Sequence, residues 1–160
     1  MLFRSILVSI DASGSMDGGE VEVARDMMAT MYKAINGIRG VRLEGIVWAG
    51  GGADEVGVSS INNYRQCSRI HCRSNYGSTP TPYAVEYSER VLEHMKGRKK
   101  LLIVITDGSP NYCSDGSLNA NQMVRKEVNR ARKKGYGTLG MYIGHGDNSN
   151  MEIMFGGILL

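Results

Sequence analysis

Two kinds of hydrophobic pattern alternate along the chain, and together they predict an α/β fold. The runs 3–10 and 101–105 are apolar on both faces, which is typical of strands buried inside a parallel sheet. Elsewhere, apolar positions recur at three- and four-residue spacing, which indicates amphipathic helices. The predicted strands are 3–10, 41–48, 55–61, 101–105 and 138–143, with a terminal fragment at 158–160; the predicted helices are 20–36, 82–96, 118–134 and 148–155.

The lengths of the connections predict how the strands pair. Only a few residues, including a predicted turn at Gly50-Gly51-Gly52, separate strands 41–48 and 55–61, so these two should be antiparallel. The remaining strands alternate with helices, as in parallel sheets. We therefore predict a three-layer, doubly wound, Rossmann-like sheet, mostly parallel with one antiparallel edge strand. A length of 160 residues suits a single domain over 1–160.

Helical spacing also predicts which side chains face the core. Thr81 should cap the second helix, with Pro82 as its first helical residue. Residues 62–78, before this helix, read as a polar loop. The expected core positions are Val21, Ala24, Met28, Met31 and Ile35 in the first helix, Ala84, Tyr87, Val91 and Met95 in the second, and Val124, Val128 and Ala131 in the third.

Composition and charge narrow the class of protein. No apolar run approaches the roughly 18 residues of a membrane-spanning helix, and Asp11 interrupts the N-terminal run, so we expect a cytoplasmic protein without an export signal. The net charge is only +3. Basic residues cluster at 98–100 and 125–134, but no aromatics interleave with them, which favours a solvated surface over a nucleic-acid-binding face.

Cysteine and histidine residues in two loops leave three readings open. Three thiolates and an imidazole could form a tetrahedral zinc site, although Cys-x₃-His-Cys is not a standard zinc spacing. A local disulfide is the second reading, but an odd number of cysteines argues against a disulfide framework. Free thiols are the reading we favour. The residues concerned are Cys67, His71, Cys72 and Cys113.

Hydroxyl and carboxylate side chains gather where predicted strands end and where a helix begins. The strands that end near Asp11 and Asp107 should be neighbours at the centre of the sheet, which brings both carboxylates to one edge. Two such charges repel each other unless a cation lies between them. Hard oxygen donors suit Mg²⁺, Mn²⁺ or Ca²⁺ rather than zinc or copper. The predicted metal ligands are Asp11, Ser13, Ser15, Thr79 and Asp107.

Three motifs in this order resemble the metal-ion-dependent adhesion site of von Willebrand factor A (VWA) domains. They are Asp11-x-Ser-x-Ser15, Gly77-Ser-Thr79 and Thr106-Asp-Gly108. The resemblance implies that Ser13 and Ser15 bind the metal directly, and that Thr79 binds it directly or through water. It implies that Asp11 and Asp107 act largely through bridging water. The vacant coordination position would then accept an Asp or Glu of a partner protein.

Two segments resemble one branch of this family more specifically, the VWA subunit of cobalt chelatase. Residues 98–110 look like its central strand and metal loop, and residues 139–145 look like its last strand and the Gly-His that follows. Such subunits work with a ring-shaped AAA+ ATPase of the MoxR-like or chelatase type. The resemblance therefore implies an AAA+ ATPase as a partner. The lack of a long apolar run predicts that no membrane is a partner.

A metal-dependent hydrolase or phosphotransferase on a similar sheet is the alternative. Phosphatases of the haloacid dehalogenase type also place an Asp after the first strand, but they need a second Asp two residues later as the general acid. Here that position is Ser13, which cannot transfer the proton near neutral pH. No Ser-His-Asp arrangement is apparent in the sequence either. The residues therefore favour a non-enzymatic interaction module.

Overall fold

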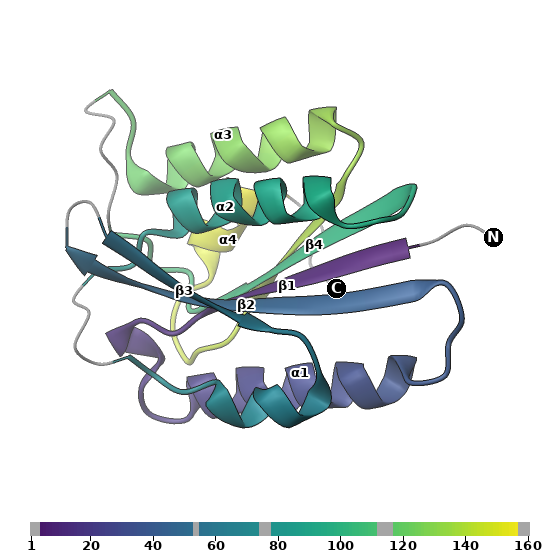
Figure 1. The fold of residues 1–160 in the computed structure, drawn as a ribbon. Coiled ribbons are helices and arrows are strands. Elements are labelled where there is room, and N and C mark those ends of the chain that lie inside the picture. Colours follow the sequence, from purple (N-terminus) through teal and green to yellow (C-terminus); the bar gives the residue numbers. More distant parts are fainter. Residues whose placement is uncertain (1–3, 53–54, 74–77, 112–116, 157–160) are drawn as a thin grey trace.

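The computed structural model describes residues 4–52, 55–73, 78–111 and 117–156, and in this part of the chain five strands form one mixed sheet (Figure 1). Their order is β3-β2-β1-β4-β5. β1 pairs in parallel with both β2 and β4, β4 pairs in parallel with β5, and only β3 is antiparallel. The predicted fold class is therefore confirmed. The strands are β1 (Arg4–Asp11), β2 (Val41–Gly52), β3 (Glu55–Ile61), β4 (Lys99–Thr106) and β5 (Gly137–Tyr142).

Helices cover both faces of the sheet, which gives three layers (Figure 1). On one face lie α1 (Glu20–Ile35) and the 3-10 helix η2 (Tyr64–Arg69); on the other lie α2 (Thr81–His94), α3 (Ala120–Lys133) and α4 (Ser149–Phe155). A short 3-10 helix, η1 (Gly14–Met16), follows β1. Alternate residues of the central strands enter opposite cores, because successive side chains of a strand point to opposite faces. Leu7 and Leu102 pack on the α2 side, and Val8 and Ile103 pack on the α1 side.

The two central strands end side by side. Ile10 of β1 is in register with Ile105 of β4, so Asp11 lies beside the last residue of β4, Thr106. Asp107 follows directly. The expectation that the strands leading to Asp11 and Asp107 are neighbours at the centre of the sheet is confirmed.

The predicted turn at Gly50–Gly52 is wrong, because β2 continues to Gly52 with a register shift between these two glycines. The segment before α2 explains why a glycine is needed there. Ser78 forms an isolated antiparallel bridge with Gly50, whose N–H donates to the Ser78 carbonyl at 3.1 Å. A Cβ on Gly50 would lie 2.2 Å from Ser78 Oγ. The glycine therefore allows the chain that carries Thr79 to approach the end of β2.

Several element boundaries also differ from the prediction. The expected polar loop 62–78 contains η2, whose N-terminus is capped by the Asn63 side chain. The N-cap of α2 is Pro80, so Thr81 is its first helical residue, and the buried Thr81 hydroxyl has no hydrogen-bond partner among the described residues. α3 begins at Ala120 after a capping box on Asn119. The predicted strand fragment 158–160 lies outside the described residues.

The predicted core face of α2 is confirmed at Ala84 and Met95, which are buried, and Val91 is partly buried, but Tyr87 differs. Tyr87, expected in the core, is 43% exposed, whereas Val85 and Leu92 are fully buried. Glu89 is also buried, at 1% exposure, because two basic residues of the α3 end contact it. Arg130 Nε lies 2.8 Å from Glu89 Oε2, and Lys134 Nζ lies 2.5 Å from Glu89 Oε1. Contacts with the neighbouring helix thus compensate the charge of Glu89 on the buried face of α2.

The core faces of α1 and α3 agree better with the spacing. Met31 and Ile35, towards the end of α1, are only partly buried. The other predicted positions are buried: Val21, Ala24 and Met28 in α1, and Val124, Val128 and Ala131 in α3.

Every helix in the described part of the chain is too short or too polar to cross a lipid bilayer.

Candidate metal site

Asp11 is the central and most deeply buried residue of the predicted set. It is the last residue of β1, and its side chain is inaccessible to solvent. Its Oδ1 accepts the Ser13 N–H at 2.9 Å, and its Oδ2 accepts the Thr106 hydroxyl at 2.8 Å. Burial raises the pKa of Asp11 to about 6; the hydrogen bonds from Ser13 and Thr106 oppose this shift, and Asp107 adds to it. A cation at this position would favour the charged carboxylate.

The two serines extend from Asp11 on the turn η1. Ser13 is buried and Ser15 is exposed, and their hydroxyl oxygens lie 3.1 Å apart. The turn is closed by the Met16 N–H, which donates to the Ser13 carbonyl at 3.0 Å, while the Met16 side chain is fully buried. The alternate spacing of the residues therefore brings one carboxylate and two hydroxyls to the same edge of the sheet.

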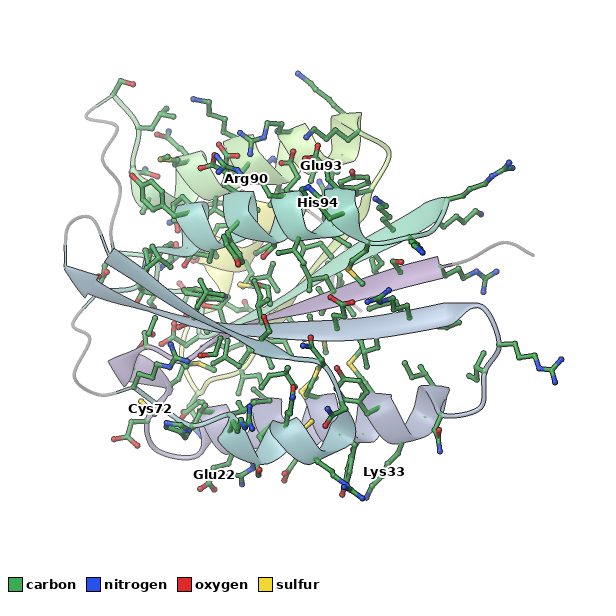
Figure 2. All side chains as sticks on the ribbon, in the orientation of Figure 1. Glu22, Lys33, Cys72, Arg90, Glu93 and His94 are labelled. Atoms are coloured by element: carbon green, nitrogen blue, oxygen red, sulfur yellow. The ribbon has the colours of Figure 1, made fainter. Side chains whose placement is uncertain are left out.

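The segment after η2 supports this turn from the outside. Cys72, which Figure 2 shows near η1, donates its thiol to the Ser13 carbonyl at 3.2 Å. The next residue, Arg73, donates its backbone N–H to the Ala12 carbonyl at 2.9 Å. The Arg73 side chain reaches across to β3, where it donates to the Gly57 carbonyl and the Ser59 hydroxyl.

Thr106 joins the β1 side of the site to the loop after β4. Its hydroxyl donates to Asp11 and accepts the Gly108 N–H at 3.2 Å. Gly108 has a φ of +76°, a conformation that suits glycine. Asp107, between them, is partly buried, and its Oδ1 accepts the Ser109 N–H at 3.1 Å. One hydroxyl thus fixes the relation between the two acidic segments.

Thr79 reaches the same edge from the start of α2. It is buried, its N–H donates to Asn111 Oδ1 at 2.6 Å, and its carbonyl accepts the Asn111 N–H at 3.3 Å. Asn111 belongs to the loop after β4, and Ser78 is bonded to β2. Among the described hydrogen bonds, Thr79 is joined to the other four predicted residues only indirectly. Gly77 of the same motif lies outside the described residues.

The donor set fits a hard divalent cation. Carboxylate and hydroxyl oxygens are the ligands that Mg²⁺, Mn²⁺ and Ca²⁺ prefer. None of the ion pairs among the described residues includes Asp11, so no lysine or arginine in this part of the chain neutralises it. A bound cation would therefore supply the positive charge that this buried carboxylate lacks.

The cysteines in the described residues have separate environments. Cys67 is buried and contacts the Asn63 carbonyl through its thiol, whereas Cys72 contacts Ser13, and the two do not form a disulfide. His71 is exposed. In the part of the chain that the structure describes, no three His, Cys, Asp or Glu side chains gather to hold a metal. Cys113, the fourth candidate zinc ligand, lies outside that part.

Two supporting residues were missed from the sequence. Thr106 belongs to a motif that we identified, but its bond to Asp11 depends on the register of β1 and β4. Asn111 gave no signal, because an asparagine in a polar loop is commonplace. Its role appears only once the Thr79 segment and the β4 loop are brought together.

A doubly wound sheet with hydroxyls and carboxylates at the ends of its central strands defines the class of this protein. The von Willebrand factor type A domain matches residues 5–157, and the chain belongs to this family. VWA domains generally mediate protein–protein interactions. A search of curated protein sequences finds no match.

Solved structures share this fold at low sequence identity. The pilus adhesin SpaC from Lactobacillus rhamnosus GG, in its open conformation, is 18% identical with a TM-score of 0.76; the match covers 96% of this chain and 27% of the adhesin. Proximal thread matrix protein 1 from the mussel byssus is 17% identical with a TM-score of 0.68, covering 96% of this chain and 40% of that protein. BatB from Bacteroides thetaiotaomicron is 19% identical with a TM-score of 0.64; the match covers 88% of this chain and 66% of BatB.

Proposed function

We propose that this chain binds a partner protein through a divalent cation, and that it has no catalytic activity of its own. The observation that carries the proposal is the buried Asp11 carboxylate, to which, among the described residues, only uncharged groups donate hydrogen bonds, and which Thr106 links to the loop of Asp107. Membership of the VWA family supports an interaction module. Ser13, two residues after Asp11, offers no general acid near neutral pH, which supports a non-enzymatic role.

The chain's own residues have distinct roles in this proposal. The hydroxyls of Ser13, Ser15 and Thr79 contribute neutral oxygen donors. Asp11 and Asp107 contribute negative charge, and the contacts with Ser13 and Thr106 hold the Asp11 carboxylate in one orientation. The cation, when bound, supplies a positive centre that attracts a carboxylate. Because most of its ligands are neutral, we propose that it binds an Asp or Glu side chain of the partner.

An AAA+ ATPase of the MoxR-like or chelatase type is the partner class that we propose to test first. The support is the resemblance of residues 98–110 and 139–145 to the VWA subunit of cobalt chelatase. These residues form β4 with the Asp107 loop, and much of β5, so the resembling segments lie beside the candidate site.

Titration calorimetry with Mg²⁺ and Mn²⁺ tests the metal. We expect Asp11→Ala to abolish binding and leave the fold mostly intact, because Asp11 lies at the edge of the sheet rather than in its apolar core. Asp26→Ala is the matched control, since Asp26 is an exposed aspartate of α1. Unchanged Mg²⁺ affinity in Asp11→Ala would falsify the proposed site.

A pull-down with AAA+ ATPases of the same source tests the partner. Binding of the wild-type protein should be lost in EDTA and restored by added Mg²⁺ or Mn²⁺. Even with Mg²⁺ present, Asp11→Ala should capture as little ATPase as the wild-type protein does in EDTA. Capture that is indifferent to the chelator would reject the metal-dependent mode of binding.

A further inference from the structure

Helix α4 packs directly against the loop that carries Asp107. A Cβ on Gly108 would lie 3.4 Å from the Tyr142 ring and 3.6 Å from the Met151 side chain, and Met151 is buried in α4. Gly108 itself is buried. Its φ is positive, a backbone conformation that a residue with a side chain would adopt only with strain. The conformation of this loop therefore depends on the α4 side chains that pack against it.

A pair of asparagine side chains connects α3 and α4 to this loop. Asn150 Nδ2 donates to the Gly108 carbonyl at 3.0 Å, and Asn150 Oδ1 accepts from Asn121 Nδ2 at 2.9 Å. On its other side, Gly108 donates its N–H to Thr106, which donates in turn to Asp11. The hydrogen bonds thus run without a break from Asn121 through Asn150, Gly108 and Thr106 to the Asp11 carboxylate.

We infer that Asn150 is a positioning residue for the cation site: by holding the Gly108 carbonyl, it fixes the loop of Asp107 relative to Asp11. This inference rests on the proposed function. Without Asn150, the carbonyl side of Gly108 loses its side-chain anchor, and glycine has more backbone freedom than any other residue. Ordering the loop would then cost free energy at the moment the cation binds. An amide suits this role because it donates to Gly108 and accepts from Asn121 at once.

Mg²⁺ affinity, measured by calorimetry, is the first test. We expect Asn150→Ala and the similarly sized Asn150→Leu to weaken Mg²⁺ binding about tenfold, the scale typical of residues that orient metal ligands. Asn121→Ala should have a smaller effect, because it removes only the outer bond. Asn148→Ala is the matched control, since exposed Asn148 precedes α4 and its side chain makes no capping bond.

Amide hydrogen exchange in EDTA, followed by NMR, is the second test and needs no metal. The Gly108 amide should exchange faster in Asn150→Ala than in wild type and in Asn148→Ala. Wild-type exchange in Asn150→Ala would overturn the inference, and so would faster exchange with unchanged Mg²⁺ affinity, which would show a merely structural role. If wild-type protein binds no Mg²⁺, Mn²⁺ or Ca²⁺, the proposed function fails, whereas the exchange rate still decides whether Asn150 holds the loop.

Discussion

Asp11 and Glu89 are both almost completely buried carboxylates, yet the fold treats their charges differently. Glu89 of α2 contacts Arg130 and Lys134, and the latter also contacts Glu93, which Figure 2 shows on the same helix. In the part of the chain that the structure describes, Asp11 accepts hydrogen bonds only from uncharged groups of Ser13 and Thr106. A buried charge without a counter-charge costs stability. Glu89 therefore belongs to the scaffold, whereas the Asp11 carboxylate is where we propose that a cation supplies the missing positive charge.

Glu89, Glu93 and Glu127 form a cluster with Arg130 and Lys134, which we call the Glu89 cluster. Removing the positive charge of Arg130 from it should have the largest effect on folding. Arg130 contacts Glu89 and Glu127 at 2.8 Å each, so Arg130→Ala leaves both carboxylates with less compensation. We expect the free energy of unfolding to fall by about 3 kcal/mol, the low end for a broken buried pair because Arg130 is partly exposed and Lys134 remains. Urea unfolding measures the change.

The control for this variant is Lys133→Ala. Lys133 is exposed on the same helix, and its substitution should change the free energy of unfolding by no more than about 0.5 kcal/mol. Mg²⁺ affinity should be the same in both variants. An unchanged free energy of unfolding in Arg130→Ala would mean that burial of Glu89 does not require the charge of Arg130. The contrast between Glu89 and Asp11 would then be lost.

Removing a neutral donor from Asp11 should have a smaller effect on folding and a larger one on the metal. Thr106→Val leaves Asp11 Oδ2 and the Gly108 N–H without their partner. We expect a loss of about 2 kcal/mol in unfolding free energy and about tenfold weaker Mg²⁺ binding. Urea unfolding and calorimetry measure the two effects.

Thr81→Val is the matched control for Thr106→Val. The Thr81 hydroxyl is equally buried but, within the described ranges, has no hydrogen-bond partner, so its removal should leave stability unchanged or slightly higher. Equal effects of the two substitutions would indicate that the Thr106–Asp11 bond contributes nothing.

The smallest expected effect is on the pH dependence of stability, and it concerns Glu127, an acid of the Glu89 cluster whose charged form is disfavoured by burial. Burial raises the pKa of Glu127 above its usual 4.5, and Arg130 only partly opposes this. An acid whose pKa is higher in the folded state gives stability at low pH that is lost as the pH rises through the folded pKa. Glu127→Gln should therefore lose less stability than wild type as the pH rises above about 4.5. The charged groups around Glu127 are Arg130, Glu86, Glu89 and Lys126.

Urea unfolding at a series of pH values measures this slope. Glu22→Gln is the control, since Glu22 is exposed on α1 and should leave the slope unchanged. Identical pH profiles for Glu127→Gln and wild type would show that burial of Glu127 carries no cost.

The sheet was predictable because β1 and β4 are buried on both faces and therefore leave unbroken apolar runs in the sequence. Helix α2 shows where such reasoning fails. Its spacing placed Tyr87 inside, although Tyr87 is exposed, and gave no sign that Glu89 is buried against basic residues some forty positions later. A single helix cannot reveal which charges its neighbour will bring. The same holds for Gly50, whose close contact with Ser78 depends on the path of a distant segment.

In the candidate site, too, some residues could be predicted from the sequence and others could not. The motifs placed Asp11, Ser13, Ser15, Thr79 and Asp107 at strand ends and at a helix start, and all five lie at one edge of the sheet. The residues that hold them were not predictable, because Asn111 and Asn150 act through backbone carbonyls and amides brought near by tertiary structure. The cation and the acidic partner stay predictions until the metal is titrated.

Arg73 has a consequence beyond the site it borders. Its guanidinium lies over the Gly57 carbonyl and the Ser59 hydroxyl of β3, the strand at one margin of the sheet. A margin strand with free backbone groups can recruit a strand from another molecule and start aggregation. Because Arg73 already donates to the Gly57 carbonyl, we expect that carbonyl to be less available for such extension of the sheet.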